Sequence, residues 1–191
     1  MRVLLTVEAQ AAMLSLIKRA RGKKVEYGLQ LLLDEDRIYP GKWKWGSVEK
    51  IRASFSGIGW FHTHPMERRM KLAPKFARGL WEEELVERPA RLSSIDILHV
   101  FVSPEHRIVG VGGTEIFQVK LVPYELEESV EVRFATLVKP VPPVLRLELL
   151  GLIPIMAALG DIPVEGIEEY YELYTFDLTS TRSYPMEVHL G

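Results

Sequence analysis

Apolar positions in the first part of the chain follow a helical period and then the pattern of a strand. Thr6 is a residue type that caps helices, Gly22 can end one, and between them four apolar residues recur at helical spacing, namely Val7, Ala11, Leu14 and Ile17. The segment 25–33 is mostly apolar and is followed by the charged turn 34–36. This pattern predicts a strand and a return strand near residues 37–39.

The middle of the chain changes from apolar to strongly charged. Residues 51–61 predict one strand or a strand pair, because their apolar residues are interrupted by glycine. Long charged side chains dominate from residue 66 to residue 91. We interpret this stretch as a helical insertion, with a helix over residues 74–86 that ends before Pro89.

Three further strands are predicted after the insertion. The apolar run 98–103 is typical of a strand, a turn follows it, and residues 107–112 predict the return strand. A third strand is expected over residues 115–122. Together these segments predict an antiparallel ladder.

The longest apolar tract of the chain is Val144–Leu159, which follows a proline-rich link. It contains Arg146 and Glu148 and is short for a membrane span, so it predicts a buried or partner-facing helix and no membrane segment. The N-terminal apolar stretch is too short for a signal peptide, which favours a cytoplasmic protein.

The order of these elements predicts an α/β fold. We expect a main domain over residues 1–140, with the insertion at about 66–91, and a C-terminal extension over residues 141–191 that is partly helical. The chain has 24 Lys and Arg against 26 Asp and Glu, so its overall charge gives no reason to expect a nucleic-acid partner. It has no cysteine, so any metal must be held by His, Asp or Glu.

Two histidines offer the clearest candidate chemistry. His62 and His64 are one residue apart at the end of a predicted strand, so both imidazoles lie on one side of the extended chain. A catalytic zinc commonly has three protein ligands and an open position for water. Asp96, three residues after Ser93, is the best candidate for the third ligand. Taken alone, the histidines could be surface residues, and Ser-x-x-Asp is a common helix cap.

Together these residues resemble a known family, the JAMM or MPN-plus zinc metallopeptidases of the Mov-type JAB proteins, in a prokaryotic or archaeal form. The family motif is an upstream Glu, then His-Ser/Thr-His-Pro, then Ser-x-x-Asp. Here it matches Glu26 with Gly28 two residues later, the run His-Thr-His-Pro at 62–65 behind an aromatic pair, and Ser93 with Asp96.

The resemblance covers about residues 1–125 and implies a role for each matching residue. It implies one zinc ion per chain, with the ligands His62, His64 and Asp96. It implies Ser93 as the residue that stabilises an oxyanion and Glu26 as general acid and base. Glu8 and Glu49 are rivals of Glu26, although neither has the family's glycine behind it.

The resemblance also implies a fold, a reaction and a partner. The fold is a JAB/MPN-like, cytidine-deaminase-like curved mixed sheet flanked by helices. The reaction is cleavage of a peptide or isopeptide bond, at the C-terminus of a ubiquitin-like modifier or its conjugates. A homodimer through the insertion or the C-terminal extension is a further expectation. The alternatives are a non-catalytic MPN scaffold subunit and a zinc hydrolase of another substrate.

Two features depart from the family pattern. Between Pro65 and Ser93 lie 27 residues, more than the family's usual spacer, so the insertion must leave the fold and return Asp96 to the metal. Loop-closure entropy grows slowly with length, so this is tolerable. The strand predicted at 98–103 also leaves little room for the helix that carries the Asp in this family.

Overall fold

The computed structural model describes residues 1–23, 25–46, 56–64, 67–72, 81–86, 90–113, 118–122, 125–160, 162–178 and 181–191. Their helices and strands, in chain order, are β1 (Arg2–Leu5), α1 (Val7–Ala20), β2 (Glu26–Asp34), β3 (Arg37–Gly46), β4 (Gly59–Thr63), β5 (Glu67–Leu72), β6 (Trp81–Val86), α3 (Ser94–Val102), β7 (Ile108–Gly112), β8 (Gln118–Val122), β9 (Glu125–Leu137), α4 (Pro143–Leu159), the short 3₁₀ helix η2 (Glu168–Tyr170), β10 (Tyr171–Leu178) and β11 (Tyr184–Glu187).

The main sheet is mixed and curved, in the order β10-β9-β7-β4-β2-β3-β1-β11, with β8 paired to β9. It is nearly closed, because its last strand returns towards the strands at its other end. The Thr136 hydroxyl on β9 donates to the Glu187 carbonyl of β11 at 2.7 Å, and the His189 N–H donates to the Leu137 carbonyl at 2.7 Å. The mixed sheet and the helices that pack on it confirm the expected α/β class.

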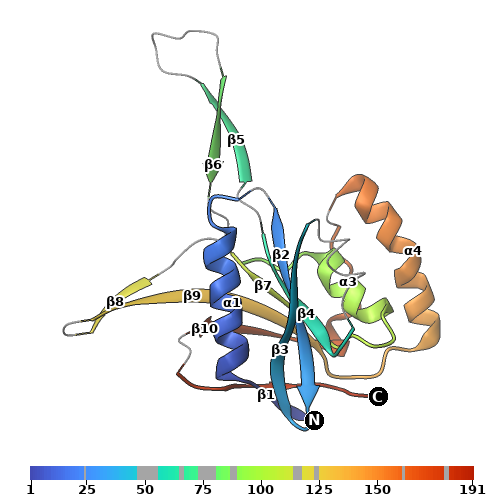
Figure 1. The fold of residues 1–191 in the computed structure, drawn as a ribbon. Coiled ribbons are helices and arrows are strands. Elements are labelled where there is room, and N and C mark those ends of the chain that lie inside the picture. The colour runs from blue at the N-terminus through green and yellow to red at the C-terminus, as the bar shows by residue number, and fades with distance from the viewer. Residues whose placement is uncertain are drawn as a thin grey trace.

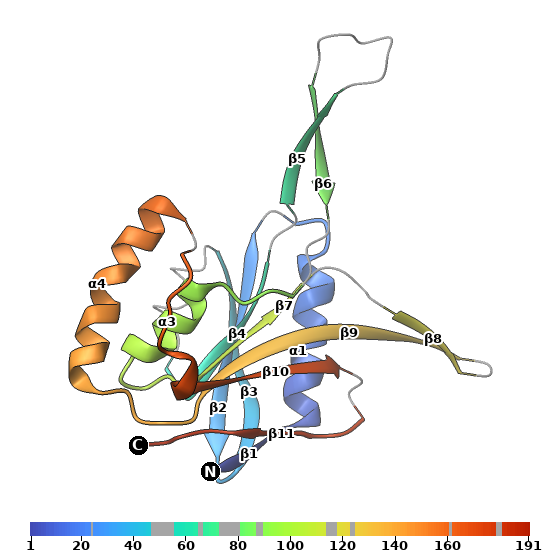
Figure 2. The same ribbon diagram turned by 180° about the vertical axis from the view of Figure 1, so that it is seen from behind.

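Helices cover the two faces of this sheet separately (Figures 1 and 2). Helix α1 packs on one face, and the strand side chains that meet it include Phe61 of β4 and Phe134 of β9. Helices α3 and α4 lie against the other face, where Trp60 of β4 and Val109 of β7 are buried. Since consecutive strand residues point to opposite faces, Trp60 and Phe61 fix which side of β4 each later residue occupies.

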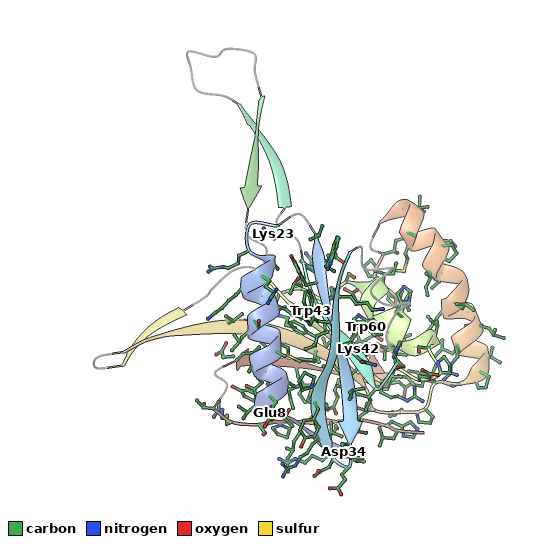
Figure 3. All side chains as sticks on the ribbon, viewed as in Figure 1. Glu8, Lys23, Asp34, Lys42, Trp43 and Trp60 are labelled. Atoms are coloured by element: carbon green, nitrogen blue, oxygen red, sulfur yellow. The ribbon has the colours of Figure 1, made fainter. Side chains whose placement is uncertain are left out.

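Helix α1 forms as the sequence predicts. Thr6 is its N-cap, and its hydroxyl accepts a hydrogen bond from the Ala9 N–H at 3.2 Å. Lys18 and Arg19 lie in its last turn, where the helix dipole favours positive charge. In Figure 3, Glu8 and Lys23 lie near opposite ends of the helix. The strand pair predicted after it is also confirmed, although β3 continues to Gly46 through residues without a clear period.

The strand predicted at 98–103 is wrong, because residues 94–102 form helix α3. Ser93 and Asp96 make a capping box that starts this helix. A short apolar run fits a buried strand and a buried helix equally, and here Leu98 and Phe101, three apart, both pack inward. The predicted antiparallel ladder therefore changes: β7 pairs in parallel with β4 and antiparallel with β9, an unpredicted strand.

The helix predicted over residues 74–86 is also wrong within the described residues, because 81–86 form strand β6. It pairs antiparallel with β5, and the register places Glu84 opposite Arg69 and Glu82 opposite Lys71. The pairing joins two separate segments of the chain, which helix propensity within one segment does not take into account. Residues 73–80 and 87–89 lie outside the described part. The hairpin of β5 and β6 projects away from the main sheet (Figures 1 and 2).

The last fifty residues contain the predicted helix α4 and two strands of the main sheet. Strand β10 pairs antiparallel with β9, and β11 pairs antiparallel with β1. The predicted third strand, 115–122, is β8 over the described residues 118–122, and it also pairs with β9. None of the helices in the described part is both long and apolar enough to cross a membrane.

Candidate metal centre

Strand β4 positions the two histidines. Its residues Gly59 to Thr63 are all buried, with β2 on one side and β7 on the other. The strands pack closely at its start, since a Cβ added to Gly59 would lie 1.9 Å from the Ile108 carbonyl oxygen, so only glycine fits there. His62 lies on the same face as Trp60, towards α3, and His64 follows just after the strand on that face.

The start of α3 positions the carboxylate. Asp96 lies in the first turn, and its Oδ2 accepts from the Ser93 hydroxyl at 2.6 Å and from the Ser93 N–H at 3.0 Å. These bonds fix the orientation of the carboxylate group. Its other oxygen, Oδ1, lies 3.6 Å from Nε2 of His62. The same aspartate therefore caps the helix with one oxygen and faces a histidine with the other.

His62, His64 and Asp96 converge at one point. One ligand atom from each lies within 4.8 Å of the others, and the two imidazole rings are 5.2 Å apart between centroids. Zinc–ligand bonds of about 2.0–2.2 Å in tetrahedral geometry separate neighbouring ligand atoms by about 3.3–3.6 Å. The His62–Asp96 pair already has this spacing. Side-chain rotations that move the ligand atoms by about an ångström would bring the distances to His64 into the same range.

Burial distinguishes the three ligands. The side chains of His62 and Asp96 are 1% and 3% exposed, whereas His64 is only partly buried. Placing an imidazole and a carboxylate in the interior is costly unless charge and hydrogen bonds compensate it, and a divalent cation supplies such compensation. The group could hold a metal ion, and solvent would reach it from the side of His64.

Glu26 reaches the same face of the sheet through the pairing of β2 with β4. Gly28 lies opposite His62 in the antiparallel register. Continuing that register by two residues places Glu26 opposite His64, and directly opposite residues point to the same face. The Tyr27 N–H donates to the Thr63 hydroxyl at 3.1 Å, which extends the link between the two strands beyond Gly28. Glu26 itself is partly buried.

No protein-family model, curated protein or solved structure matches this chain. Two imidazoles and one carboxylate are a donor set that suits zinc and related divalent metals. With three protein ligands, such an ion keeps a coordination position for water or substrate.

The two rival glutamates and two further histidines lie apart from this group. Glu8 is in the first turn of α1, on the other side of the sheet, and Glu49 lies outside the described residues. His106 packs edge-on against Trp60 at 4.9 Å between ring centroids, and His189 follows β11 at the edge of the sheet. Among the described residues, the only group of three ligands close enough to hold a metal is His62, His64 and Asp96.

Sequence analysis missed the contribution of Thr63. Its side chain is fully buried on the opposite face from the histidines, and its hydroxyl accepts the Tyr27 N–H. This bond holds β2 beside the end of β4. It therefore fixes the position of Glu26 along β2 relative to His64. The sequence offered one signal for this role. Side chains alternate between faces along His-Thr-His, so Thr63 points away from the two histidines and cannot be a ligand beside them.

Proposed function

We propose that this protein is a zinc-dependent hydrolase of the JAMM or MPN-plus kind, which cleaves a peptide or isopeptide bond. The observation that carries the proposal is the convergence of His62 and His64 from β4 with Asp96 from α3, although the 27 residues between Pro65 and Ser93 separate them in the chain. The curved mixed sheet with helices on both faces agrees with the fold that the motif implies.

In this proposal His62, His64 and Asp96 hold the zinc ion. When bound, zinc supplies a Lewis acid and lowers the pKa of a coordinated water to about 7. Asp96 enters this set already oriented, because Ser93 holds its Oδ2 with two hydrogen bonds and leaves Oδ1 directed to the site. Orientation of a ligand by such a neighbour is typical of metal centres.

Glu26 is the residue that moves protons. Its place opposite His64, at the partly open side of the site, suits a carboxylate that accepts a proton from water and returns it to the leaving amine. The Ser93 hydroxyl donates to Asp96 in this structure and would turn to donate to the developing oxyanion. The Ser93 N–H would continue to hold Asp96 after that turn.

The proposed substrate class comes from the motif. A ubiquitin-like protein, either joined to a lysine or as a precursor with a C-terminal tail, is the substrate that the resemblance implies. The hairpin of β5 and β6 lies in the chain between the two ligand-bearing segments, so it leaves and re-enters the fold near the metal centre. Loops in such positions often contact substrates.

A zinc titration combined with an activity screen on ubiquitin-like fusion proteins tests the proposal. We expect one zinc per chain and zinc-dependent cleavage at the fusion junction. Zinc binding without cleavage of any fusion would favour a hydrolase of another substrate. Protein that binds no zinc even after supplementation would contradict the enzymatic proposal and favour a scaffold subunit.

Asp96→Asn is expected to lower zinc occupancy strongly. The amide keeps an oxygen that can accept from Ser93, so the helix cap is retained, but the negative charge of the ligand is lost. Metal analysis after dialysis measures the effect, and Asp34→Asn, at the exposed end of β2, is the matched control. If Asp96→Asn retains full zinc and activity, another carboxylate must be the third ligand.

Ser93→Ala is expected to keep zinc while turnover falls by roughly a hundredfold or more, the usual cost of one oxyanion donor. The backbone N–H of residue 93 still holds Asp96. Loss of the cap side chain should also cost about 1 kcal/mol of stability. Steady-state kinetics and zinc analysis separate the two roles, and Ser103→Ala, at the other end of α3, controls for cap loss. A tenfold or greater loss of zinc affinity would instead make Ser93 a positioning residue for Asp96.

A further inference from the structure

A small cavity lies where the link from β9 to α4 meets the segment that follows β11. Its volume is about 110 Å³, and its polar side chains come from four segments, namely Arg107 before β7, Lys139 after β9, Arg146 in α4 and His189 after β11. In Figures 1 and 2, the link into α4 and the C-terminal residues lie at the same end of the molecule. One water takes roughly 30 Å³ in the liquid, so the cavity has room for a small polyatomic ion.

This cavity is at the opposite end of the strands from the metal centre. The Arg107 N–H donates to the Ile58 carbonyl at 2.6 Å, which places Arg107 beside the start of β4. His62 lies further along that strand, at a distance of about 13 Å for a rise of about 3.3 Å per residue. A ligand held in the cavity would lie away from the three metal ligands, so its binding is independent of the proposed hydrolase activity.

The cavity carries positive charge that the described residues do not neutralise. Lys139 pairs with Glu169 at 3.0 Å, and both side chains are exposed. Arg107 Nη1 donates only to a neutral group, the His106 carbonyl, at 2.8 Å. Among the described residues, no carboxylate forms an ion pair with Arg107 or Arg146. Two guanidinium groups therefore share one cavity without a counter-charge from the described part of the chain.

Burial and repulsion act on these guanidinium groups. Arg107 and Arg146 are both only partly exposed. Burial, and then the neighbouring positive charge of Arg146, lower the pKa of Arg107 below its ordinary value. Both causes penalise the charged form of a side chain that stays charged in proteins. A bound anion would remove this penalty, because it supplies negative charge and hydrogen-bond acceptors in place of water.

Two buried nitrogen atoms at the cavity have no hydrogen-bond partner within the described ranges. They are Nε of Arg146 and Nε2 of His189. Buried polar atoms are nearly always hydrogen-bonded, either within the protein or to a bound molecule. Since the Nε of an arginine can only donate, its partner must be an acceptor.

The start of α4 adds to the positive character of this region. Its N-cap is Pro142, which makes no side-chain cap, and its first turn has no acidic residue. Helices usually have a polar cap or an acidic residue there, because the first N–H groups and the helix dipole favour negative charge. Here the N–H of Arg146 donates to the Pro142 carbonyl at 2.9 Å, so this turn ends in a positive charge instead. An anion beside Arg146 would compensate both the helix start and the guanidinium.

We propose that this cavity binds a phosphate group, either as the free ion or on a small phosphomonoester, with Arg107 and Arg146 as its main ligands. A phosphate group carries up to two negative charges, so one group can neutralise both guanidiniums, whereas a carboxylate would leave one without a counter-charge. The planar fork of N–H donors in arginine matches phosphate oxygens. Lys139 lies at the exposed rim, where the remainder of an ester would leave the cavity.

Calorimetric titration of the full chain with inorganic phosphate, in a chloride buffer of constant ionic strength, tests the proposal. We expect one phosphate per chain, and we expect acetate to bind about tenfold more weakly or less, because it cannot pair with both guanidiniums. A parallel titration with glycerol 3-phosphate separates the two sources of the group. Comparable affinity would indicate a phosphomonoester ligand, and binding of inorganic phosphate alone would indicate the free ion.

Arg146→Gln is expected to weaken phosphate binding by about tenfold or more, because a charge-assisted hydrogen bond is lost. In phosphate-free buffer its Tm is expected to equal or exceed that of the wild type, because repulsion from Arg107 is relieved. Arg146→Lys keeps the charge but not the fork, and its affinity should lie between the two. Arg133→Gln is the matched control, since Arg133 is exposed on β9 and pairs with Glu131, and it should bind phosphate like the wild type.

Three outcomes would overturn the proposal. The first is a wild type without saturable phosphate binding. The second is phosphate affinity that both Arg146→Gln and Arg146→Lys leave unchanged, which would place the ion elsewhere, such as on a bound metal. The third is acetate that binds as tightly as phosphate, which would favour a carboxylate ligand. Zinc content, measured on the same samples, is expected to be equal in the variants and the wild type, so failure of this site and failure of the metal centre remain distinguishable.

Discussion

Glu26→Gln is expected to bind zinc and fold like the wild type but to lose turnover by about a hundredfold to ten-thousandfold. This is the usual cost of removing a general base. The amide has nearly the shape of the carboxylate but cannot accept a proton from water. Because Glu26 lies beside His64 without belonging to the ligand group, the change should leave the metal set intact.

The measurement is the rate of cleavage of the best fusion substrate, with zinc content determined on the same samples. Glu8→Gln is the matched control, since Glu8 lies at the start of α1 away from the metal centre. Unchanged turnover in Glu26→Gln would contradict the assignment and transfer the role to Glu49 or bulk water. A loss of zinc would show instead that Glu26 is a ligand.

His62→Ala is expected to abolish stable zinc binding and with it all activity. His62 is the buried member of the histidine pair, and no described His, Asp or Glu other than His64 and Asp96 belongs to the ligand group. A ligand present at a thousand times its Kd stabilises a protein by about 4 kcal/mol. For a chain of this size that corresponds to about 10 °C in Tm.

Thermal unfolding with zinc and with a chelator tests this expectation. The wild type should lose about 10 °C when the chelator is added, whereas His62→Ala should show the same Tm in both conditions. His189→Ala, on the far edge of the sheet, should behave like the wild type. A chelator-sensitive Tm in His62→Ala would mean that the metal is held elsewhere.

The elements with strong local signals were predicted from sequence. Thr6 caps α1, the charged turn at 34–36 separates β2 from β3, and α4 follows its proline-rich link. The prediction of helix or strand was wrong for the apolar run 98–103 and the charged run 74–86, because the spacing of their apolar residues fits both. Residues 98–102 belong to α3 because the cap at Ser93 starts a helix that buries Leu98 and Phe101, which is a tertiary effect.

The three residues that could hold a metal were predictable in identity but not in position. The face-sharing of His62 and His64 follows from the strand period, whereas the contact of Asp96 with His62 depends on where α3 packs. The strand expected at 98–103 left little room for a helix beside Asp96, whereas the structure has Asp96 in the first turn of α3. The place of Glu26 depends on the register of β2 against β4. The pattern of apolar and polar residues along one strand does not reveal this register.

The closure of the sheet by β11 links the two ends of the chain. The amino group of Met1 donates to the Val188 carbonyl at 2.8 Å, and β1 pairs with β11 along its whole length. Contacts between residues so distant in sequence form slowly, because the intervening chain loses entropy before they stabilise anything. During synthesis β1 must wait for β11 to leave the ribosome, so the sheet that carries His62 is completed only after translation of β11.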